Sequence, residues 1–203
     1  MLKRIILFFY VSIIPLMLAC TSLQKDISNN SFIFGRIISD TESLSVQYVN
    51  FIECPNTKNS KEYESDTHKQ SGYFWLANLK SGSYRAIWFY QKSLFDYITS
   101  NPGKYYILPS YGSGPFLVRI NKPGIYYMGT YKYIIDPKKN SVSKILMGSP
   151  TTFDMEKVKD DNPAEILEWI LKNRIRKSSP WYHLIEKTLK ERSWINAEDT
   201  VKL

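Results

Sequence analysis

The sequence has few residues of the kinds that usually carry catalysis. It contains two histidines, His68 and His183, and two cysteines, Cys20 and Cys54. Neither histidine begins the H-E-x-x-H pattern of zinc proteases, and the chain lacks the G-x-S-x-G turn of α/β-hydrolases. His183 and Glu186 share one helix face, where a solvated pair explains them better than a metal site. We expect no catalytic residue, metal or cofactor, and a hydrolase is the least favoured alternative.

Long apolar runs are also absent beyond the N-terminus, which has the features of a targeting segment. Lys3 and Arg4 precede an apolar run of fourteen residues, Ile5–Leu18, shorter than the roughly 20 that a spanning helix requires. Residues 16–20, LMLAC, resemble the lipobox of bacterial lipoprotein signal peptides. The resemblance implies that residues 1–19 are removed and that Cys20 carries diacylglycerol and a fatty acyl chain such as palmitate. The alternative is an uncleaved anchor or an ordinary signal peptide with an incidental cysteine.

Lipidation of Cys20 predicts a location on a bacterial envelope membrane. Thr21 follows this cysteine; in Gram-negative sorting an aspartate at that position usually retains a lipoprotein at the inner membrane. We therefore expect the outer membrane if the cell is Gram-negative. Residues 20–30 form the lipidated cysteine and a polar tether, and ten extended residues reach at most about 33–36 Å.

Acidic residues are too few to balance the basic ones, and the formal net charge is +8. Loss of Lys3 and Arg4 on cleavage lowers this charge to +6. The densest basic run is KNRIRK, residues 172–177. A diffuse positive surface suits an anionic lipid or wall polymer better than nucleic acid. The expected partners are the membrane and either an envelope protein or a wall polymer.

Cysteine is too scarce for a disulfide scaffold. If Cys20 is lipidated, Cys54 has no partner within the chain. Two interpretations of Cys54 stay open: a buried inert thiol beside a strand end, or an intermolecular disulfide.

Short β-rich runs alternate with turn-forming residues between residues 31 and 158, which predicts a mainly β, antiparallel sandwich. The expected strands are Phe32–Ile38, Ser45–Glu53, Tyr73–Ala77, Ser83–Tyr90, Tyr105–Leu108, Phe116–Asn121, Ile125–Ile135 and Ser141–Met147. We expect the third and fourth runs to pair as a hairpin and residues 55–71 to form a polar surface loop.

The stretch from residue 72 to 84 has a spacing that resembles carboxypeptidase-regulatory-like domains, which are prealbumin-like sandwiches. The matching residues are Gly72, Phe74, Leu76, Leu79, Gly82 and Tyr84. Two weaker resemblances are FxxGRII at 32–38, similar to the first strand of that family, and Val49 with Phe51, similar to its second. Residues 116–129 look like the paired-strand ending of uncharacterised bacterial lipoproteins. Together they span about residues 31–135. The resemblance implies an accessory, binding or structural module whose fold carries no catalytic residues.

The pattern changes to a helical one in the C-terminal segment, residues 159–203. Asp161-Asn-Pro and Ser179-Pro are typical helix starts. Two apolar stripes follow: Ile166, Leu167, Ile170 and Leu171, then Trp181, Leu184, Ile185, Thr188 and Leu189. We expect both helices to pack on one face of the sheet and to cover Tyr73, Trp75, Ile87 and Phe89.

Aromatic residues are abundant, with fifteen tyrosines in the chain. Several fall in segment 91–114 among Ser, Asn and Gly, a composition used by recognition loops. These candidate ligand or partner residues are Phe95, Tyr97, Tyr105, Tyr106 and Tyr111. The alternative is that the rings pack this segment onto the sandwich. The expected function is a non-catalytic binding or structural/assembly module; the alternative is a glycan- or cell-wall-binding lipoprotein.

Overall fold

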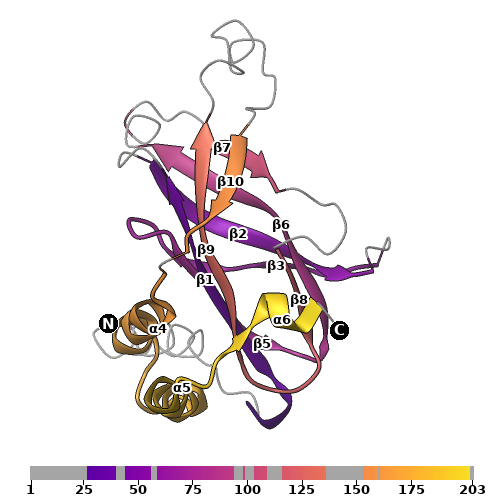
Figure 1. Ribbon diagram of the computed structural model, residues 1–203, viewed down its shortest axis with the longest axis vertical. Helices are drawn as coiled ribbons and strands as arrows, with labels where there is room; N and C mark the ends of the chain where they lie inside the picture. The colour runs from indigo at the N-terminus through magenta and orange to yellow at the C-terminus, as the bar shows by residue number, and fades with distance from the viewer. Residues whose placement is uncertain are drawn as a thin grey trace, which may run out of the picture.

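The computed structural model describes residues 27–39, 44–55, 59–93, 98, 103–108, 116–135, 153–159 and 161–201. Two β-sheets pack against each other, and the helices follow near the C-terminus (Figure 1). The predicted class, a mainly β sandwich with a C-terminal helical segment, is confirmed. The expected strand at residues 141–147 lies outside the described residues.

Among the described residues, sheet A contains six strands. The order along the main path is β10-β9-β1-β5-β4, and β11 also pairs with β9. Their bounds are β1 (Ser31–Ser39), β4 (Asp66–His68), β5 (Tyr73–Leu79), β9 (Ile125–Ile135), β10 (Phe153–Lys157) and β11 (Ile195–Asn196). The β1–β9 and β11–β9 pairs are parallel, whereas the other pairs are antiparallel. The sandwich is therefore not antiparallel throughout.

Sheet B contains five strands in the part of the chain that the structure describes. Its main path is β3-β2-β6-β7, and β8 also pairs with β6. The bounds are β2 (Leu44–Cys54), β3 (Glu62–Glu64), β6 (Gly82–Ser93), β7 (Lys104–Ile107) and β8 (Leu117–Ile120). All of its pairs are antiparallel.

The predicted hairpin between residues 73–77 and 83–90 is wrong. β5 pairs with β1 and β4 in sheet A, whereas β6 pairs with β2, β7 and β8 in sheet B. Asn78 has a positive φ of 61° and Gly82 has a φ of 156°. These unusual backbone angles turn the chain from one layer into the other. The expected loop at residues 55–71 likewise contains two short strands, β3 and β4, one in each sheet.

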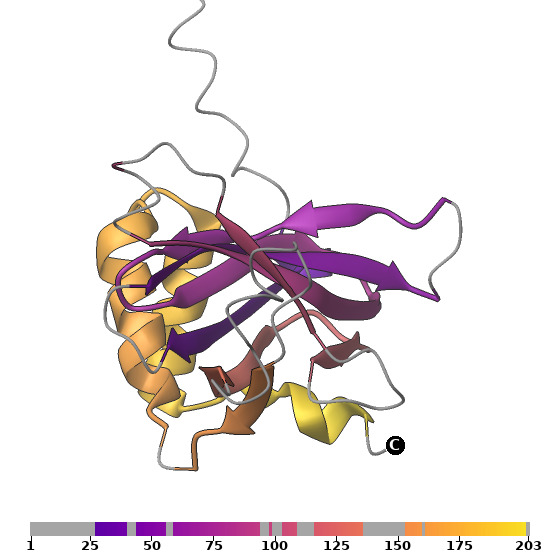
Figure 2. The ribbon, with the colours of Figure 1, turned by 90° about the horizontal axis from the view of Figure 1, so that it is seen from above.

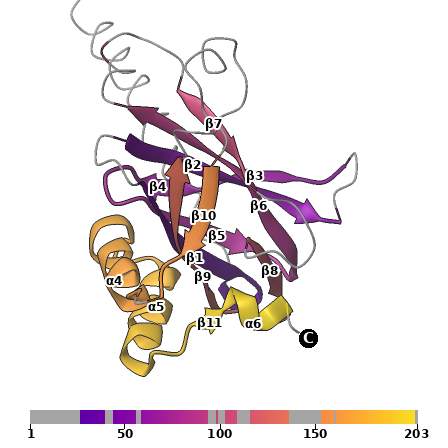
Figure 3. The ribbon, with the colours of Figure 1, turned by 45° about the horizontal axis from the view of Figure 1, so that its top comes forward.

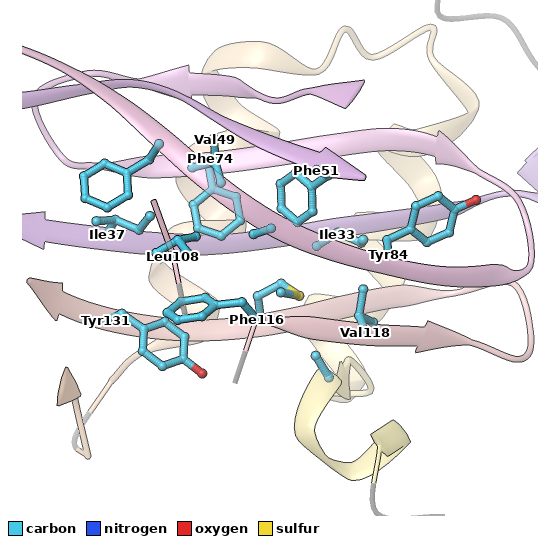
Figure 4. Packing of buried hydrophobic residues seen from close by; sticks show 14 of the residues in the cluster. Ile33, Ile37, Val49, Phe51, Phe74, Tyr84, Leu108, Phe116, Val118 and Tyr131 are labelled. Atoms are coloured by element: carbon cyan, nitrogen blue, oxygen red, sulfur yellow. The ribbon is translucent and has the colours of Figure 1, made fainter. Parts of the chain in front are cut away.

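The inner faces of the two sheets form the main apolar core. Phe74, Leu79 and Tyr84 belong to this core, and Leu76 packs against it, as the alternation predicted. Figure 4 shows Phe51 of sheet B and Phe74 of sheet A side by side between the strands, with ring centroids 6.0 Å apart. The same residues that suggested a sandwich from sequence therefore hold its two layers together.

Two tyrosines close turns in the same way on neighbouring parts of the core. The Tyr84 hydroxyl donates to the carbonyl oxygen of Lys80 at 3.0 Å, and the Tyr126 hydroxyl donates to that of Lys122 at 2.6 Å. Both tyrosines follow the spacing K-x-G-x-Y. Each ring thus fills the core while its hydroxyl donates to a turn carbonyl.

A second apolar cluster lies between the outer face of sheet A and the helices (Figure 2). α4 (Pro163–Arg174) begins at the N-cap Asn162, and α5 (Pro180–Glu191) begins at the N-cap Ser179. Ile166, Leu167, Ile170, Trp181 and Ile185 are buried in this cluster. The two predicted helices and their apolar stripes are confirmed.

Two short helices complete the described chain. η2 (Ile27–Asn29) precedes β1, and α6 (Ala197–Val201) packs on β8 and β9. Ala197 is buried in the main core, and the Thr200 hydroxyl accepts a hydrogen bond from the Arg119 amide at 3.0 Å. Figure 3 shows α6 beside β8, apart from α4 and α5. α6 was not predicted, because five residues are too few for a helical period to be visible.

Candidate functional site

The outer face of sheet A is closed by the helices. Tyr73 and Trp75 of β5 retain 4% and 5% of their surface exposed and belong to the cluster with α4 and α5. This confirms that helices cover these two rings. The Tyr73 hydroxyl donates to the Glu165 carboxylate of α4 at 3.1 Å. This face therefore offers no open apolar surface along β5.

The outer face of sheet B presents a different set of side chains because β6 contains a bulge. Phe51 pairs with Ala86 and Asn50 pairs with Trp88, which leaves Ile87 as an extra residue. Phe89 therefore points into the main core and is 0% exposed. The prediction that the helices cover Ile87 and Phe89 is wrong, because β6 belongs to sheet B whereas the helices pack on sheet A. The bulge also reverses the alternation after Ala86, which is why Phe89 points inward.

The same reversal places aromatic side chains together on the outer face. Trp88 and Tyr90 flank the inward-facing Phe89, and Tyr48 lies opposite Tyr90 on β2. The Tyr48 ring centroid lies 5.4 Å from that of Trp88 and 5.3 Å from that of Tyr90. All three rings are half-buried. Ile107 of β7 lies opposite Trp88 and is 71% exposed.

We call Tyr48, Trp88, Tyr90 and Ile107 the aromatic row. It crosses three adjacent strands of one sheet, so its members are held by ladder hydrogen bonds. The Tyr90 hydroxyl also accepts a hydrogen bond from the Gly103 amide at 2.9 Å, which fixes that ring. A preformed row of this kind provides contact area at a low cost in side-chain entropy.

The candidate residues predicted in segment 91–114 have different outcomes. Tyr106 is buried, with 2% of its surface exposed, and its ring stacks on Phe89 at a centroid distance of 4.9 Å. It is a core residue, so its assignment to a ligand surface is wrong. The backbone of Tyr105 lies in β7, but its side chain is not described. Phe95, Tyr97 and Tyr111 lie outside the described residues, as does Cys20.

A hollow with a volume of about 370 Å³ lies between β9, α4 and α6. At its wall, Asp161 accepts hydrogen bonds from the Tyr127 hydroxyl and from the Thr130 amide. Burial, and then the bond to Asp161, raise the pKa of Tyr127 above its ordinary value. Tyr127 therefore stays neutral at physiological pH and acts as a donor. Asn162, within the predicted helix start Asp161-Asn-Pro, caps α4.

The polar groups at the other side of this hollow also pair with each other. Lys157 forms an ion pair with Glu198 at 2.8 Å, and Tyr131 donates to the same carboxylate at 3.4 Å. Burial and Glu198 raise the pKa of Tyr131. These contacts join α6 to strands β9 and β10. We interpret the hollow as a packing junction between the helices and strands β9 and β10 rather than as a reaction site.

A third cluster surrounds His68 at the edge of sheet A. The centroid of its ring lies 4.1 Å from that of Trp169 of α4, and its Nδ1 lies 3.0 Å from the Ser71 hydroxyl. The Arg174 guanidinium lies 5.6 Å from the Trp169 ring centroid. Burial, and then Arg174, lower the pKa of His68. Burial raises the pKa of Asp66 nearby, and Arg174 partly opposes this increase.

No group of three or more His, Cys, Asp or Glu side chains is placed to hold a metal ion among the described residues. Within those residues, no helix is long and apolar enough to cross a membrane. Cys54 is a half-buried free thiol at the end of β2, so neither interpretation of this cysteine is decided.

Comparison with known proteins identifies no relative that reveals function. No protein-family model and no curated protein matches the sequence. Among solved structures, the chain is similar to a leucine-rich repeat protein from Bacteroides thetaiotaomicron, with a TM-score of 0.30 and 14% identity. The match covers 52% of this chain and 12% of that protein. The similarity is too low to inform either fold or function.

Proposed function

We propose that this chain is a lipid-anchored protein of the bacterial cell envelope that acts as a non-catalytic binding module. In this proposal Cys20 carries the lipid, the residues between Cys20 and Ile27 form the tether, and the sandwich presents the aromatic row to a ligand. The membrane is the outer membrane if the cell is Gram-negative. The lipobox-like residues 16–20 support the anchor.

The observation that carries the binding role is the aromatic row itself. α4 and α5 cover the aromatic residues on the outer face of sheet A, whereas Trp88, Tyr90 and Ile107 lie on the outer face of sheet B. A side chain with 71% of its surface exposed, such as Ile107, gains little burial energy from folding. Rings that gather beside it on a rigid sheet suit contact with a partner.

An envelope glycan is the ligand class that the row favours. The carbon-bound hydrogens on one face of a pyranose ring form a flat apolar surface, which packs against an aromatic ring. Tyr48, Trp88 and Tyr90 lie on adjacent strands with centroids 5.3 and 5.4 Å apart. Tyrosine and tryptophan also carry a polar group that hydrogen-bonds to sugar hydroxyls. A protein partner bound at a sheet edge is the assembly alternative.

The direct test is binding of the purified protein to a panel of envelope glycans, including peptidoglycan fragments. We expect Trp88→Ala and Tyr48→Ala each to weaken binding about tenfold, since an anchor ring at an interface contributes at least 1–2 kcal/mol. Tyr182→Ala is the matched control, because Tyr182 is a half-buried ring on α5. We expect it to leave binding unchanged.

The outcomes separate the two ligand classes. Circular dichroism and urea unfolding establish that each variant retains its fold. If no glycan binds and crosslinking in intact envelopes recovers a protein partner, the glycan assignment is wrong and the assembly alternative replaces it. If glycans bind equally to wild type and Trp88→Ala, the aromatic row is not the binding surface.

A further inference from the structure

The described chain begins beside the helices. Ile27 packs against the cluster between sheet A and the helices. Four residues after η2 starts, β1 begins, and the Phe32 ring lies 5.5 Å from that of Trp181 in the first turn of α5. Cys20 precedes Ile27 by seven residues, which reach at most about 25 Å when fully extended. A lipid on Cys20 would therefore hold the helical side of the molecule close to the membrane.

The densest basic run in the chain lies just before this first turn of α5, at the end of α4 and in the link between the two helices. Lys172, Arg176 and Lys177 are exposed at the end of α4 and in the link to α5. We call these three residues the basic corner. Neither Lys172 nor Lys177 forms an ion pair with any residue that the structure describes. Arg174, in contrast, turns toward the rings of Trp75 and Trp169.

The basic corner borders a hollow of about 360 Å³ between α4 and α5. Its lining combines apolar side chains with two lysines and one glutamate: Leu171, Ile175, Tyr182, Lys172, Lys177 and Glu168. A phospholipid has the matching composition, with an anionic phosphate separated by the glycerol esters from apolar acyl chains. The two lysines outnumber Glu168, so the local charge favours an anion.

We propose that the basic corner docks on anionic phospholipid headgroups of the membrane that holds the lipid anchor. This inference rests on the proposed lipidation of Cys20. Each basic residue near an anionic membrane surface contributes about 1 kcal/mol, and this attraction fades beyond about 8–10 Å. Because the tether from Cys20 to Ile27 reaches at most about 25 Å, it allows the basic corner to approach the membrane surface to within that range. Anchor and basic corner together provide the two membrane contacts that fix an orientation.

The docked orientation turns the aromatic row away from the bilayer. α4 and α5 contact sheet A, and the aromatic row lies on the outer face of sheet B. Figures 1 and 3 both show β7, which carries Ile107, at the end of the molecule opposite α5. The side of the protein that faces the membrane is therefore distinct from the side that is available to an envelope ligand.

The test measures orientation on vesicles by energy transfer to a dye-labelled lipid. The full-length lipoprotein is purified from membranes and reconstituted into phosphatidylcholine, with or without phosphatidylglycerol. A donor dye is attached at Ser178, or at Ile107, through an azide-bearing amino acid. Ser178 is exposed beside the basic corner. We expect phosphatidylglycerol to raise transfer from residue 178 about twofold, without raising transfer from residue 107. Salt of about 1 M, where the screening length is about 3 Å, should remove the increase.

Charge variants assign the effect to the basic corner. Lys172→Glu with Lys177→Glu should abolish the increase. The control, Lys61→Glu with Lys92→Glu, makes the same change in net charge on sheet B and should preserve it. An increase that persists in the first double variant, or no increase with phosphatidylglycerol, overturns the inference. Binding of a soluble anionic wall polymer without this lipid dependence also overturns it, in favour of the polymer.

The anchor is tested separately from the docking. The mass of the purified protein shows whether Cys20 carries lipid. If it does not, the proposed function fails, and the Cys20 thiol is coupled to a maleimide phospholipid in the Cys54→Ser background. The same transfer comparison then still decides whether the basic corner docks on anionic lipid.

Discussion

The indole nitrogen of Trp181 donates a hydrogen bond to the side-chain oxygen of Asn78 at 3.3 Å. This bond links the first turn of α5 to a bulge in β5, where Ser31 pairs with Leu79 and Ile33 with Leu76. Asn78 has a φ of 61°, a region that asparagine tolerates better than most residues. One side chain therefore makes the bulge possible and attaches the helix to it.

Substitution of Asn78 separates these two roles. Asn78→Gly removes the hydrogen bond and keeps the backbone relaxed, so we expect a loss of about 1 kcal/mol in the free energy of unfolding. Asn78→Ala also removes the hydrogen bond but leaves a Cβ in the left-handed region. It should therefore lower the free energy of unfolding by about 1 kcal/mol more than Asn78→Gly does. Urea unfolding of both variants measures the difference. Equal stability of the two would contradict the assigned role of the backbone angle.

Gly72 is the position where a side chain should be least tolerated. It has a φ of 69°, and an added Cβ would lie 1.8 Å from the carbonyl oxygen of Ile37. Because backbone atoms cannot move aside easily, we expect Gly72→Ala to lower the free energy of unfolding by more than about 3 kcal/mol. The control is Gly124→Ala, whose closest contact is the flexible tip of Ile195 at 3.2 Å. The midpoint temperature of thermal unfolding should be far lower for Gly72→Ala than for Gly124→Ala.

His68 should make stability depend on pH. Burial and Arg174 lower its pKa below the ordinary value near 6.5, so the folded state favours the neutral ring. This contribution is complete above about pH 6.5 and is lost as the pH falls through the lowered pKa. We expect the free energy of unfolding to fall between pH 7 and 5, and His68→Gln to remove part of that fall. Asp66 contributes equally to the wild type and to His68→Gln, so the difference between their free energies of unfolding isolates the histidine. Parallel curves of free energy against pH for the two proteins would refute the prediction.

Asp161 should stabilise the junction between β9 and α4. Its carboxylate accepts hydrogen bonds from Tyr127 and from the Thr130 amide. We expect Asp161→Ala to lower the free energy of unfolding by about 2 kcal/mol, and Asp161→Asn by about half as much because one oxygen remains. Asp199→Ala is the control, since Asp199 is exposed and contacts Asn196 at 3.3 Å. Chemical denaturation that gives equal losses for Asp161→Ala and Asp199→Ala would contradict the role of Asp161.

Local patterns predicted much of the fold. The helix starts at Asp161-Asn-Pro and Ser179-Pro were visible because capping signals are local properties of the sequence. The two apolar stripes, one containing Ile166 and the other Ile185, were visible because a helical period is also local. Strand β9 was predicted with its observed bounds, Ile125–Ile135. The partner of each strand was harder to predict, because pairing depends on residues far apart in the chain. The expected hairpin of β5 and β6 failed for this reason.

The candidate site depended on a feature that the sequence pattern hides. Ile87 is an extra residue opposite β2, and it reverses the alternation between Ala86 and Phe89. Without it, Trp88 and Tyr90 would point into the core. A composition argument identified Tyr106 as a surface residue, yet its ring stacks inside. A run of consecutive aromatic residues, WFY at 88–90, was the available signal, but it does not say which rings are exposed.

The anchor at Cys20 is the central claim, and metabolic labelling with an alkyne analogue of palmitate tests it most directly. The account predicts label on the wild-type protein in the membrane fraction. It predicts no label on Cys20→Ala and undiminished label on Cys54→Ala, in which the half-buried thiol of β2 is removed. Absence of label from the wild type, or recovery of wild type and Cys20→Ala alike in the soluble fraction, would contradict the account.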